Sequence, residues 1–234
     1  RGAPFVCLNA ETGEVIWRVN GMFRGTRWGG NAVIGDSIIA TMDTYDQRVY
    51  AIGKGPSKTT VEASPEIAVH GSKILVKGMV TDISPGTQDS AIKLRFPNGV
   101  PAVADESMSD WMLYVYKQFS CPANVKGVEV IIEVHDPNGN YYEVARAISD
   151  GSGFYSATFE PPVPGKYTII ARFDGSKAYY GSHAETAIYV EEAPPTTPEA
   201  TPAPQAPVET YFAISTIAII VAIAIVGLLI LRKR

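Results

Sequence analysis

The sequence predicts a mainly β protein that carries one helical insert and ends in one membrane-spanning helix. Three observations lead to this prediction. Short runs with alternating apolar and polar residues recur through the first 190 residues, separated by turns rich in Gly, Asp and Asn. One stretch, residues 105–119, instead shows the spacing of a helix. Residues 212–231 contain no charged side chain.

Residues 1–58 are expected to form antiparallel hairpins. The turn ETGE separates the runs FVCLNA and VIWRVNG, and the turn DTYDQ separates NAVIGDSIIATM from RVYAIGKG. Alternating apolar residues on both sides of such turns are typical of hairpins. We therefore expect four strands, two that end one sheet and two that open the next.

This segment resembles a known repeat. Residues 10–17, AETGEVIW, resemble the A-x-T-G-x-x-x-W signature of the quinoprotein-type (PQQ-like) β-propeller repeat, and residues 32–40 with 48–52 resemble the opening strands of its next blade. The resemblance implies that Thr12 and Gly13 turn the hairpin and that Trp17 packs between blades. A propeller needs at least four blades, so we expect an incomplete ring that pairs with upstream propeller blades, in preceding sequence or in a separate chain.

A quinoprotein enzyme would hold its cofactor with acidic and amide ligands to calcium, a catalytic Asp and often a vicinal disulfide. The sequence has no Cys-Cys pair. Asp43 and Asp46 are expected to be ordinary turn residues and not cofactor ligands. Arg24 and Arg27 lie in the connection between blades and could face a ligand. No cofactor is expected in this chain. The alternative is that it binds PQQ or calcium.

Residues 59–192 predict a β-sandwich of seven short strands. The strand-like runs are EIAVHG, KILVKGMVTDI, VEVIIEVHD, YYEVARAIS, GFYSATFE, KYTIIARFD and AETAIYVEE. Residues 161–167, PPVPGKY, resemble the P-x-P-G-x-Y corner of Ig-like domains on bacterial and archaeal cell surfaces, and residues 173–182 resemble the last hairpin of those domains. The resemblance implies an Ig-like β-sandwich and says very little about function.

An insert of about residues 84–126 interrupts the sandwich and contains the predicted helix 105–119. Ser107 followed by Asp110 suggests a capping box at its start, and Pro122 is expected to end it. One apolar stripe follows helical spacing: Met108, Trp111, Met112, Val115 and Phe119. The stripe either packs on the sandwich or the propeller strands, or forms an exposed helix that binds a partner.

Motifs for catalysis are absent from the sequence. It has no CxxC pair, no Gly-rich phosphate loop and no Gly-x-Ser-x-Gly elbow. The histidines His70, His135 and His183 fall in different strands or loops without ligand spacing. Cys7 and Cys121 lie in different modules, and whether they form a disulfide stays open. We therefore expect no catalytic residue in this chain.

One hairpin turn has some character of a calcium site. Asp136, Asn138 and Asn140 alternate as the ligands of a calcium loop do, with Glu143 nearby. The EF-hand pattern requires Gly at its sixth position, where this sequence has Tyr141. The alternative is a plain hairpin turn, which we expect.

A stalk is predicted at residues 193–210, which hold six of the 17 prolines. Such a segment cannot bury apolar surface and favours extended polyproline II structure. Its 18 residues at ~3.1 Å each would reach about 50 Å.

The membrane helix is predicted at residues 211–231. Its uncharged part begins at Phe212 and ends at Leu231, and these 20 residues at ~1.5 Å each match the thickness of a bilayer core. The basic residues Arg232, Lys233 and Arg234 follow at 232–234 and are expected to lie on the cytoplasmic side. The sequence thus predicts a single-pass protein of the cell membrane, with the body extracellular and the C-terminus cytoplasmic.

The net charge of the chain limits which partners are expected. Without the three basic residues of the tail, 17 Lys and Arg face 24 Asp and Glu, a net charge of −7. Nucleic acid is therefore not expected as a partner, because phosphate binding needs a basic surface. The arrangement resembles archaeal cell-surface proteins. It implies a membrane-anchored binding or structural protein for adhesion, envelope assembly or partner recognition.

The expected partners are the lipid bilayer, other surface proteins or glycans, and upstream propeller blades. The alternative function is a membrane-tethered PQQ-dependent oxidoreductase whose catalytic residues lie in upstream sequence.

Overall fold

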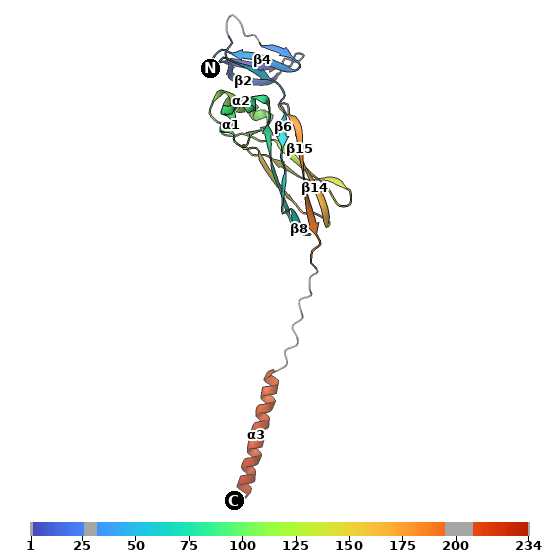
Figure 1. Ribbon diagram of the computed structural model, residues 1–234. Coiled ribbons are helices and arrows are strands. Elements are labelled where there is room, and N and C mark those ends of the chain that lie inside the picture. The colour runs from blue at the N-terminus through green and yellow to red at the C-terminus, as the bar shows by residue number, and fades with distance from the viewer. Residues whose placement is uncertain (1, 26–31, 195–207, 234) are drawn as a thin grey trace. The chain divides into compact units, whose positions relative to one another are not determined.

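The computed structural model describes residues 2–25, 32–194 and 208–233 (Figure 1). The chain forms two compact units, Arg1–Ala193 and Pro194–Arg234. The first unit is β-rich and holds two short helices, and the second holds one long helix. The predicted fold class is confirmed: mainly β, with a helical insert and one long apolar helix at the C-terminus.

Two small sheets begin the β-rich unit. Strands β1 (Ala3–Leu8) and β2 (Val15–Phe23) form an antiparallel hairpin. Strands β3 (Val33–Gly35), β4 (Ile38–Asp43) and β5 (Arg48–Ile52) form an antiparallel sheet in that order. The prediction of four strands is wrong, because Asp36 and Ser37 both take positive φ, 48° and 63°, and turn the expected single strand into a hairpin.

The first turn is the one expected from the Thr-Gly pair. Gly13 has φ 74°, a conformation that glycine adopts without strain. The side chain of Asn9 accepts hydrogen bonds from the backbone N–H groups of Glu11 and Thr12. Together these features fix the hairpin between β1 and β2.

Aromatic side chains join the two small sheets. The ring of Phe5 lies 5.6 Å from Trp17 and 5.1 Å from Phe23, centroid to centroid. Phe23 in turn lies 5.4 Å from the ring of Tyr50 in β5. Trp17 and Ile52 pack against the same cluster. One face of β1–β2 is therefore buried against one face of β3–β5.

The rest of the unit is a sandwich of two five-stranded sheets in the described residues. It holds all seven predicted strands and three further short ones that the sequence did not predict. In one sheet, β9 (Ile74–Asp82) pairs with the other four strands: β6 (Ser57–Thr59), β7 (Glu62–Ser64), β10 (Val100–Pro101) and β13 (Phe154–Phe159). The other sheet has the order β12 (Tyr141–Ile148), β11 (Glu129–His135), β14 (Gly165–Gly175), β15 (Tyr180–Glu191) and β8 (Ile67–Val69). Strand β8 runs parallel to β15, and the other pairs are antiparallel.

The two sheets enclose one hydrophobic core. Alternate residues of β9, β11 and β14 point into it, including Val76, Ile132 and Ile169, which are almost wholly buried. Tyr167 is fully buried at the start of β14, and its hydroxyl donates to the carbonyl of Val163 at 2.8 Å. A tyrosine bonded in this way to the backbone just upstream is the corner found in immunoglobulin-like sandwiches.

The insert contains more structure than predicted. A 3₁₀ turn (Pro85–Gln88) and helix α1 (Ser90–Arg95) precede helix α2 (Asp105–Lys117), which corresponds to the predicted helix. The prediction of a capping box at Ser107 and Asp110 is wrong. The residue before α2 is Ala104, which gives no side-chain cap, and Ser107 lies in the first turn, where its Oγ accepts from the N–H of Lys126 at 3.0 Å.

Helix α2 also ends earlier than expected. Gln118 takes a left-handed conformation, φ 55°, and its N–H bonds back to the carbonyl of Leu113. The helix therefore ends before Pro122 is reached, since a left-handed residue directs the chain away from the helix axis.

Helix α2 is packed on two sides. Trp111 and Val115 are buried with Ile92, Val100 and Val103 of the insert. On another side, Leu113 is buried against β2, with Met112 and Phe119 packed around it. The stripe therefore packs on the strands and the insert, and the alternative of an exposed partner-binding helix is wrong.

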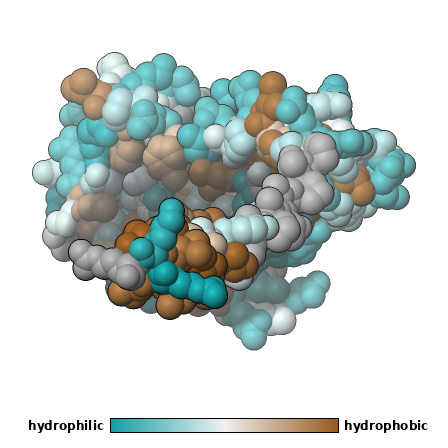
Figure 2. Space-filling view, turned by 90° about the horizontal axis from the view of Figure 1, so that it is seen from below, coloured by the Kyte–Doolittle hydropathy of each residue, from teal (hydrophilic) through white to brown (hydrophobic). Residues whose placement is uncertain are grey.

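The second unit consists of helix α3 (Val208–Arg232), preceded by residues outside the described part of the chain. Its 25 residues include a window with mean hydropathy 3.0, none of which is buried. Figure 2 shows apolar side chains around this helix and hydrophilic ones at its end. At ~1.5 Å per residue it is long enough to cross a bilayer. Most of the predicted stalk, 193–210, lies outside the described residues. Its last three residues, 208–210, belong to α3, so the helix begins three residues earlier than predicted.

Candidate functional site

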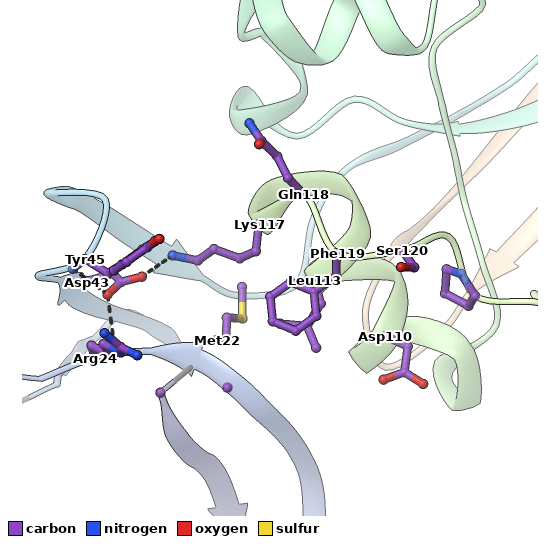
Figure 3. Close-up of a pocket in the computed structure, with 13 residues that line it drawn as sticks. Met22, Arg24, Asp43, Tyr45, Asp110, Leu113, Lys117, Gln118, Phe119 and Ser120 are labelled. Carbon is purple, nitrogen blue, oxygen red and sulfur yellow. Dashed lines mark hydrogen bonds and ion pairs between the residues drawn. The ribbon is translucent and has the colours of Figure 1, made fainter.

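The most distinctive side-chain cluster joins the insert to the small sheets. Lys117, in the last turn of α2, places its Nζ 2.5 Å from Oδ2 of Asp43 and 2.7 Å from Oδ2 of Asp46 (Figure 3 shows the contact with Asp43). The Lys117 and Asp43 side chains are only 7% and 5% exposed, and that of Asp46 is 26% exposed. We call these three residues, with Tyr50, the ion cluster.

Hydrogen bonds hold the carboxylates in place. The second oxygen of Asp43, Oδ1, accepts from the backbone N–H groups of Arg24 and Tyr45, both at 3.0 Å. Burial alone would raise the pKa of Asp43, but the hydrogen bond from Lys117 and these two N–H groups lower it overall. The turn between β4 and β5 therefore presents a fixed negative charge to α2.

Asp46 is held in the same way. Its Oδ2 accepts from the hydroxyl of Tyr50 and its Oδ1 from the N–H of Arg48. Here too burial opposes ionisation, yet the hydrogen bonds from Lys117 and Tyr50 lower the pKa of the carboxyl. The two carboxylates therefore stay ionised beside one cation.

The cation itself is enclosed by aromatic rings. Nζ of Lys117 lies 3.9 Å from the centroid of the Tyr50 ring and 5.5 Å from that of Phe23, within the range of cation–π attraction. Burial would lower the pKa of Lys117, but hydrogen bonds to Asp43 and Asp46 raise it overall. The ion cluster therefore holds one cation between two carboxylates, largely shielded from solvent.

A half-open cavity of about 630 Å³ adjoins the ion cluster. The end of α2, the segment up to Pro122, the end of β2 and the turn after β4 line it. Figure 3 shows Arg24 and Asp110 on opposite sides of this space. The guanidinium of Arg24 lies 5.2 Å from the ring centroid of Tyr45. The lining combines the charged side chains of Arg24, Asp43, Asp110 and Lys117 with the apolar ones of Met22, Leu113 and Phe119.

The turn residues have a second role that the sequence did not reveal. Asp43 and Asp46 do bond the N–H groups of their own turn, as expected. Their contact with Lys117 spans 74 and 71 residues of sequence. Of the two candidate ligand-facing arginines, Arg24 lies at the cavity and Arg27 is outside the described residues.

The three histidines lie at separate places, and the two cysteines are not bonded to each other. Nε2 of His70 lies 3.0 Å from the carbonyl oxygen of Pro162, whereas His135 and His183 lie on β11 and β15. Cys7 and Cys121 are both free thiols, half-buried and exposed respectively. These two cysteines therefore do not form a disulfide in the structure.

The turn after β11 is organised by Asp136. Its carboxylate accepts from the backbone N–H groups of Asn138 and Asn140 and from the side-chain amide of Asn140. The hydrogen bond from the Asn140 side chain is the largest cause of the lowered pKa of Asp136. Both oxygens of Glu143 face Arg146 instead. No group of three His, Cys, Asp or Glu side chains suited to a metal occurs among the described residues.

Because the Asp136 oxygens are occupied by hydrogen bonds of the turn, calcium is expected to leave the stability unchanged. The melting temperature measured in millimolar CaCl2 should equal that in EGTA. Asp136→Asn should lower the melting temperature equally in both solutions, since the turn loses charge-assisted acceptors. A rise in melting temperature on adding calcium that Asp136→Asn abolishes would contradict this.

Comparisons with known proteins assign no family. No family model matches the chain, and no curated protein matches it. Solved structures that align with it include a tandem repeat from the extending region of a large adhesion protein, at 13% identity and TM-score 0.34, covering 66% of this chain and 30% of that one. The sporulation control protein Spo0M from Bacillus subtilis aligns at 10% identity and TM-score 0.31, covering 60% and 51%.

The α2-macroglobulin of E. coli aligns at 12% identity and TM-score 0.34, covering 82% of this chain and 10% of that one. The chain thus spans about half or less of each of these proteins. Similarity this low does not assign the fold or the function of these proteins to this chain. The class of protein rests on the structure itself: a β-rich unit with a two-sheet sandwich, joined to a helix that could span a membrane.

Proposed function

We propose that the chain is a membrane-anchored cell-surface protein that presents its β-rich unit for binding. Helix α3 carries the proposal, because it is apolar around its whole circumference and no part of its apolar window is buried in the structure. A free helix of this kind in water would expose a large apolar surface, which a bilayer removes. The lipid bilayer is therefore its first partner.

The charges around α3 support one orientation. Arg232 ends the helix and Lys233 follows it, whereas Glu209 lies in its first turn. Basic residues beside a span favour the cytoplasmic side, and Tyr211 and Phe212 suit the opposite interface. We therefore place the C-terminus in the cytoplasm and the β-rich unit outside the cell.

Within the β-rich unit, we propose a role in adhesion, envelope assembly or partner recognition, with surface proteins or glycans as partners. The strand order and the Tyr167 corner support an Ig-like sandwich. The Gly13 turn and the aromatic packing of Trp17 support the PQQ-like repeat. The ion cluster supports a structural rather than catalytic use of its charges, since the Lys117 ammonium is bound by both carboxylates and joins α2 to the β4–β5 turn.

The two native cysteines allow a direct test of orientation. In a Cys7→Ala variant, exposed Cys121 is the remaining thiol, and a membrane-impermeant maleimide added to intact cells is expected to label it. In Cys7→Ala/Cys121→Ala/Lys233→Cys, labelling is expected only after the cells are permeabilised. The reverse pattern would overturn the orientation. Release of the full chain from membranes by alkaline carbonate would overturn the anchor.

A further inference from the structure

Strand β12 forms one edge of its sheet and pairs only with β11 among the described strands. Its eight residues make it the longest edge strand in the described part of the sandwich. A strand at an edge presents unpaired N–H and C=O groups that can pair with another chain. The sequence of β12, YYEVARAI, contains no Pro or Lys, two residues that commonly prevent such pairing.

Two hydrogen bonds at the ends of the β11–β12 hairpin show which backbone groups of β12 point away from β11. The N–H of Asp136 donates to the carbonyl of Asn140, and the N–H of Ser149 donates to the carbonyl of Val128. Residues along an antiparallel strand alternate between bonding one neighbour and facing the other side. Counted inward from both ends of β12, the residues whose backbone groups face the open edge are Tyr141, Glu143, Arg146 and Ile148.

A β-bulge gives the two halves of β12 the same pattern. The register shifts between Ile132 and Glu133 of β11, which leaves Val144 as the extra residue of β12. Without the bulge, Glu143 and Arg146 would lie on opposite faces of the sheet, because side chains alternate along a strand. With it, both lie on the solvent face, where the Arg146 guanidinium binds the Glu143 carboxylate. The residues between and beside them pack against the core instead: Tyr142, Val144, Ala145 and Ala147.

This pattern makes the open edge complementary to itself. When two copies of β12 pair antiparallel with Glu143 opposite the partner's Arg146, the twofold axis also places Arg146 opposite the partner's Glu143. The exposed apolar residues at the strand ends are matched as well, since Tyr141 then lies opposite the partner's Ile148. These side chains are free to make such contacts, because Tyr141 is 55% exposed and Ile148 71%. Opposite charges and apolar pairs facing each other across two strands both stabilise a sheet.

The strand directions determine where the two chains leave such a pair. Strand β12 is antiparallel to β11, β11 to β14, and β14 to β15, so β15 runs opposite to β12 within one copy. The twofold axis that pairs β12 with its copy reverses β15 too. The two β15 strands therefore end, each at Glu191, at opposite ends of the paired sandwiches, and from there each chain continues toward its α3. Chains that leave in opposite directions suit anchors in two facing membranes.

We propose that β12 pairs antiparallel with β12 of a second copy of this chain on a facing membrane. The contact joins two five-stranded sheets into one continuous sheet and is isologous, the commonest kind of contact in homo-oligomers. The proposal deepens the proposed binding function and rests on it, because it names the partner in adhesion as the same protein. It gives the chain a homophilic role, in which one cell binds another through identical strands.

The test uses the full chain in lipid nanodiscs that each hold one copy, so that association of discs reports pairing between two membranes. Sedimentation velocity at increasing concentration is expected to show pairs of wild-type discs. Glu143→Arg and Arg146→Glu should each weaken this pairing about tenfold or more, because each variant brings like charges together twice across the twofold axis. An equal mixture of the two variants should recover the pairing, since every charge at these positions then faces its opposite.

Lys77→Glu is the matched control. It makes the same charge reversal as Arg146→Glu, but in an exposed ion pair with Glu62 on the other sheet of the sandwich. The affinity between discs should therefore stay unchanged. Equal unfolding midpoints of the variants and the wild type show that the variants fold, as expected for substitutions of exposed residues.

Any of four results would overturn the proposal. Wild-type discs could stay single, the single variants could pair as well as the wild type, or the mixture could fail to recover pairing. In discs loaded with two copies, pairing within one disc and none between discs would contradict the facing-membrane arrangement. Flotation with liposomes reads the anchor separately, so failure of pairing is distinguishable from failure of the proposed function.

Discussion

Replacing Lys117 with methionine is expected to lower the free energy of unfolding of the β-rich unit by about 3–5 kcal/mol, the usual effect of removing one member of a buried ion pair. Methionine keeps the apolar stem but removes the charge. The carboxylates of Asp43 and Asp46 would then face each other in a half-buried site without their shared cation. The junction between α2 and the β4–β5 turn should open first.

Urea unfolding, followed by tryptophan fluorescence, measures this loss. Lys126→Met is the matched control, because its ion pair with Glu106 is exposed, 68% and 59%, and should contribute less than about 1 kcal/mol. Adding Asp43→Asn and Asp46→Asn to Lys117→Met should recover part of the stability, since no unpaired charge would remain buried. Equal small losses for Lys117→Met and Lys126→Met would show that the ion cluster does not stabilise the unit.

The pH dependence of this loss follows from the pKa shifts. The pKa values of Asp43 and Asp46 are lowered, so their contribution is present above the usual 3.8 and disappears as the pH falls through the lowered values. The pKa of Lys117 is raised, so its contribution is present below 10.5 and disappears as the pH rises through the raised value. Between about pH 4 and pH 10.5 the stability difference between wild type and Lys117→Met should therefore be constant. Below about pH 4 this difference should become smaller.

Trp111→Ala is expected to lower the free energy of unfolding by about 3–5 kcal/mol, as large-to-small changes of buried aromatic residues do. Trp111 is 4% exposed, and its ring lies 5.9 Å from Phe96 and 5.4 Å from Tyr114. Its removal leaves a cavity between α1 and α2. The indole Nε1 is buried without a hydrogen-bond partner among the described residues, so Trp111→Phe should be less harmful.

Thermal and urea unfolding of the purified chain measure both variants. Leu94→Ala is a suitable control, because Leu94 lies on α1 with 85% exposure and should change stability by no more than about 0.5 kcal/mol. An unchanged melting temperature in Trp111→Ala would mean that the insert does not pack as described, and would restore the alternative of an exposed partner-binding helix.

Local patterns predicted seven strands of the sandwich and most of α3, because alternation and turn residues act within a few positions of each other. They missed the very short strands β6, β7 and β10 and the division between β3 and β4. The same reasoning placed Trp111 and Val115 on a buried face. It missed Leu113, because an amphipathic pattern assumes one apolar face and α2 is buried on two sides. Helix α1 was missed because six residues are too few to show a period.

The ion cluster was beyond sequence reasoning for a different reason. Lys117 has the position of an ordinary last-turn lysine, and Asp43 and Asp46 have the positions of ordinary turn residues. Only the tertiary packing of α2 on β2 brings them together, and no spacing in the sequence encodes a contact between residues 71–74 positions apart.

The parallel pairing of β8 with β15 has a mechanical consequence. Tyr189 and Glu191 lie beside Ile67 and Val69, and the N–H of Tyr189 donates to the carbonyl of Glu66 while the N–H of His70 donates to that of Glu191, both at 2.8 Å. A pull that enters β8 from its N-terminal side and leaves β15 at its C-terminal side slides these strands in opposite directions. The hydrogen bonds between them are then loaded together in shear and not one after another.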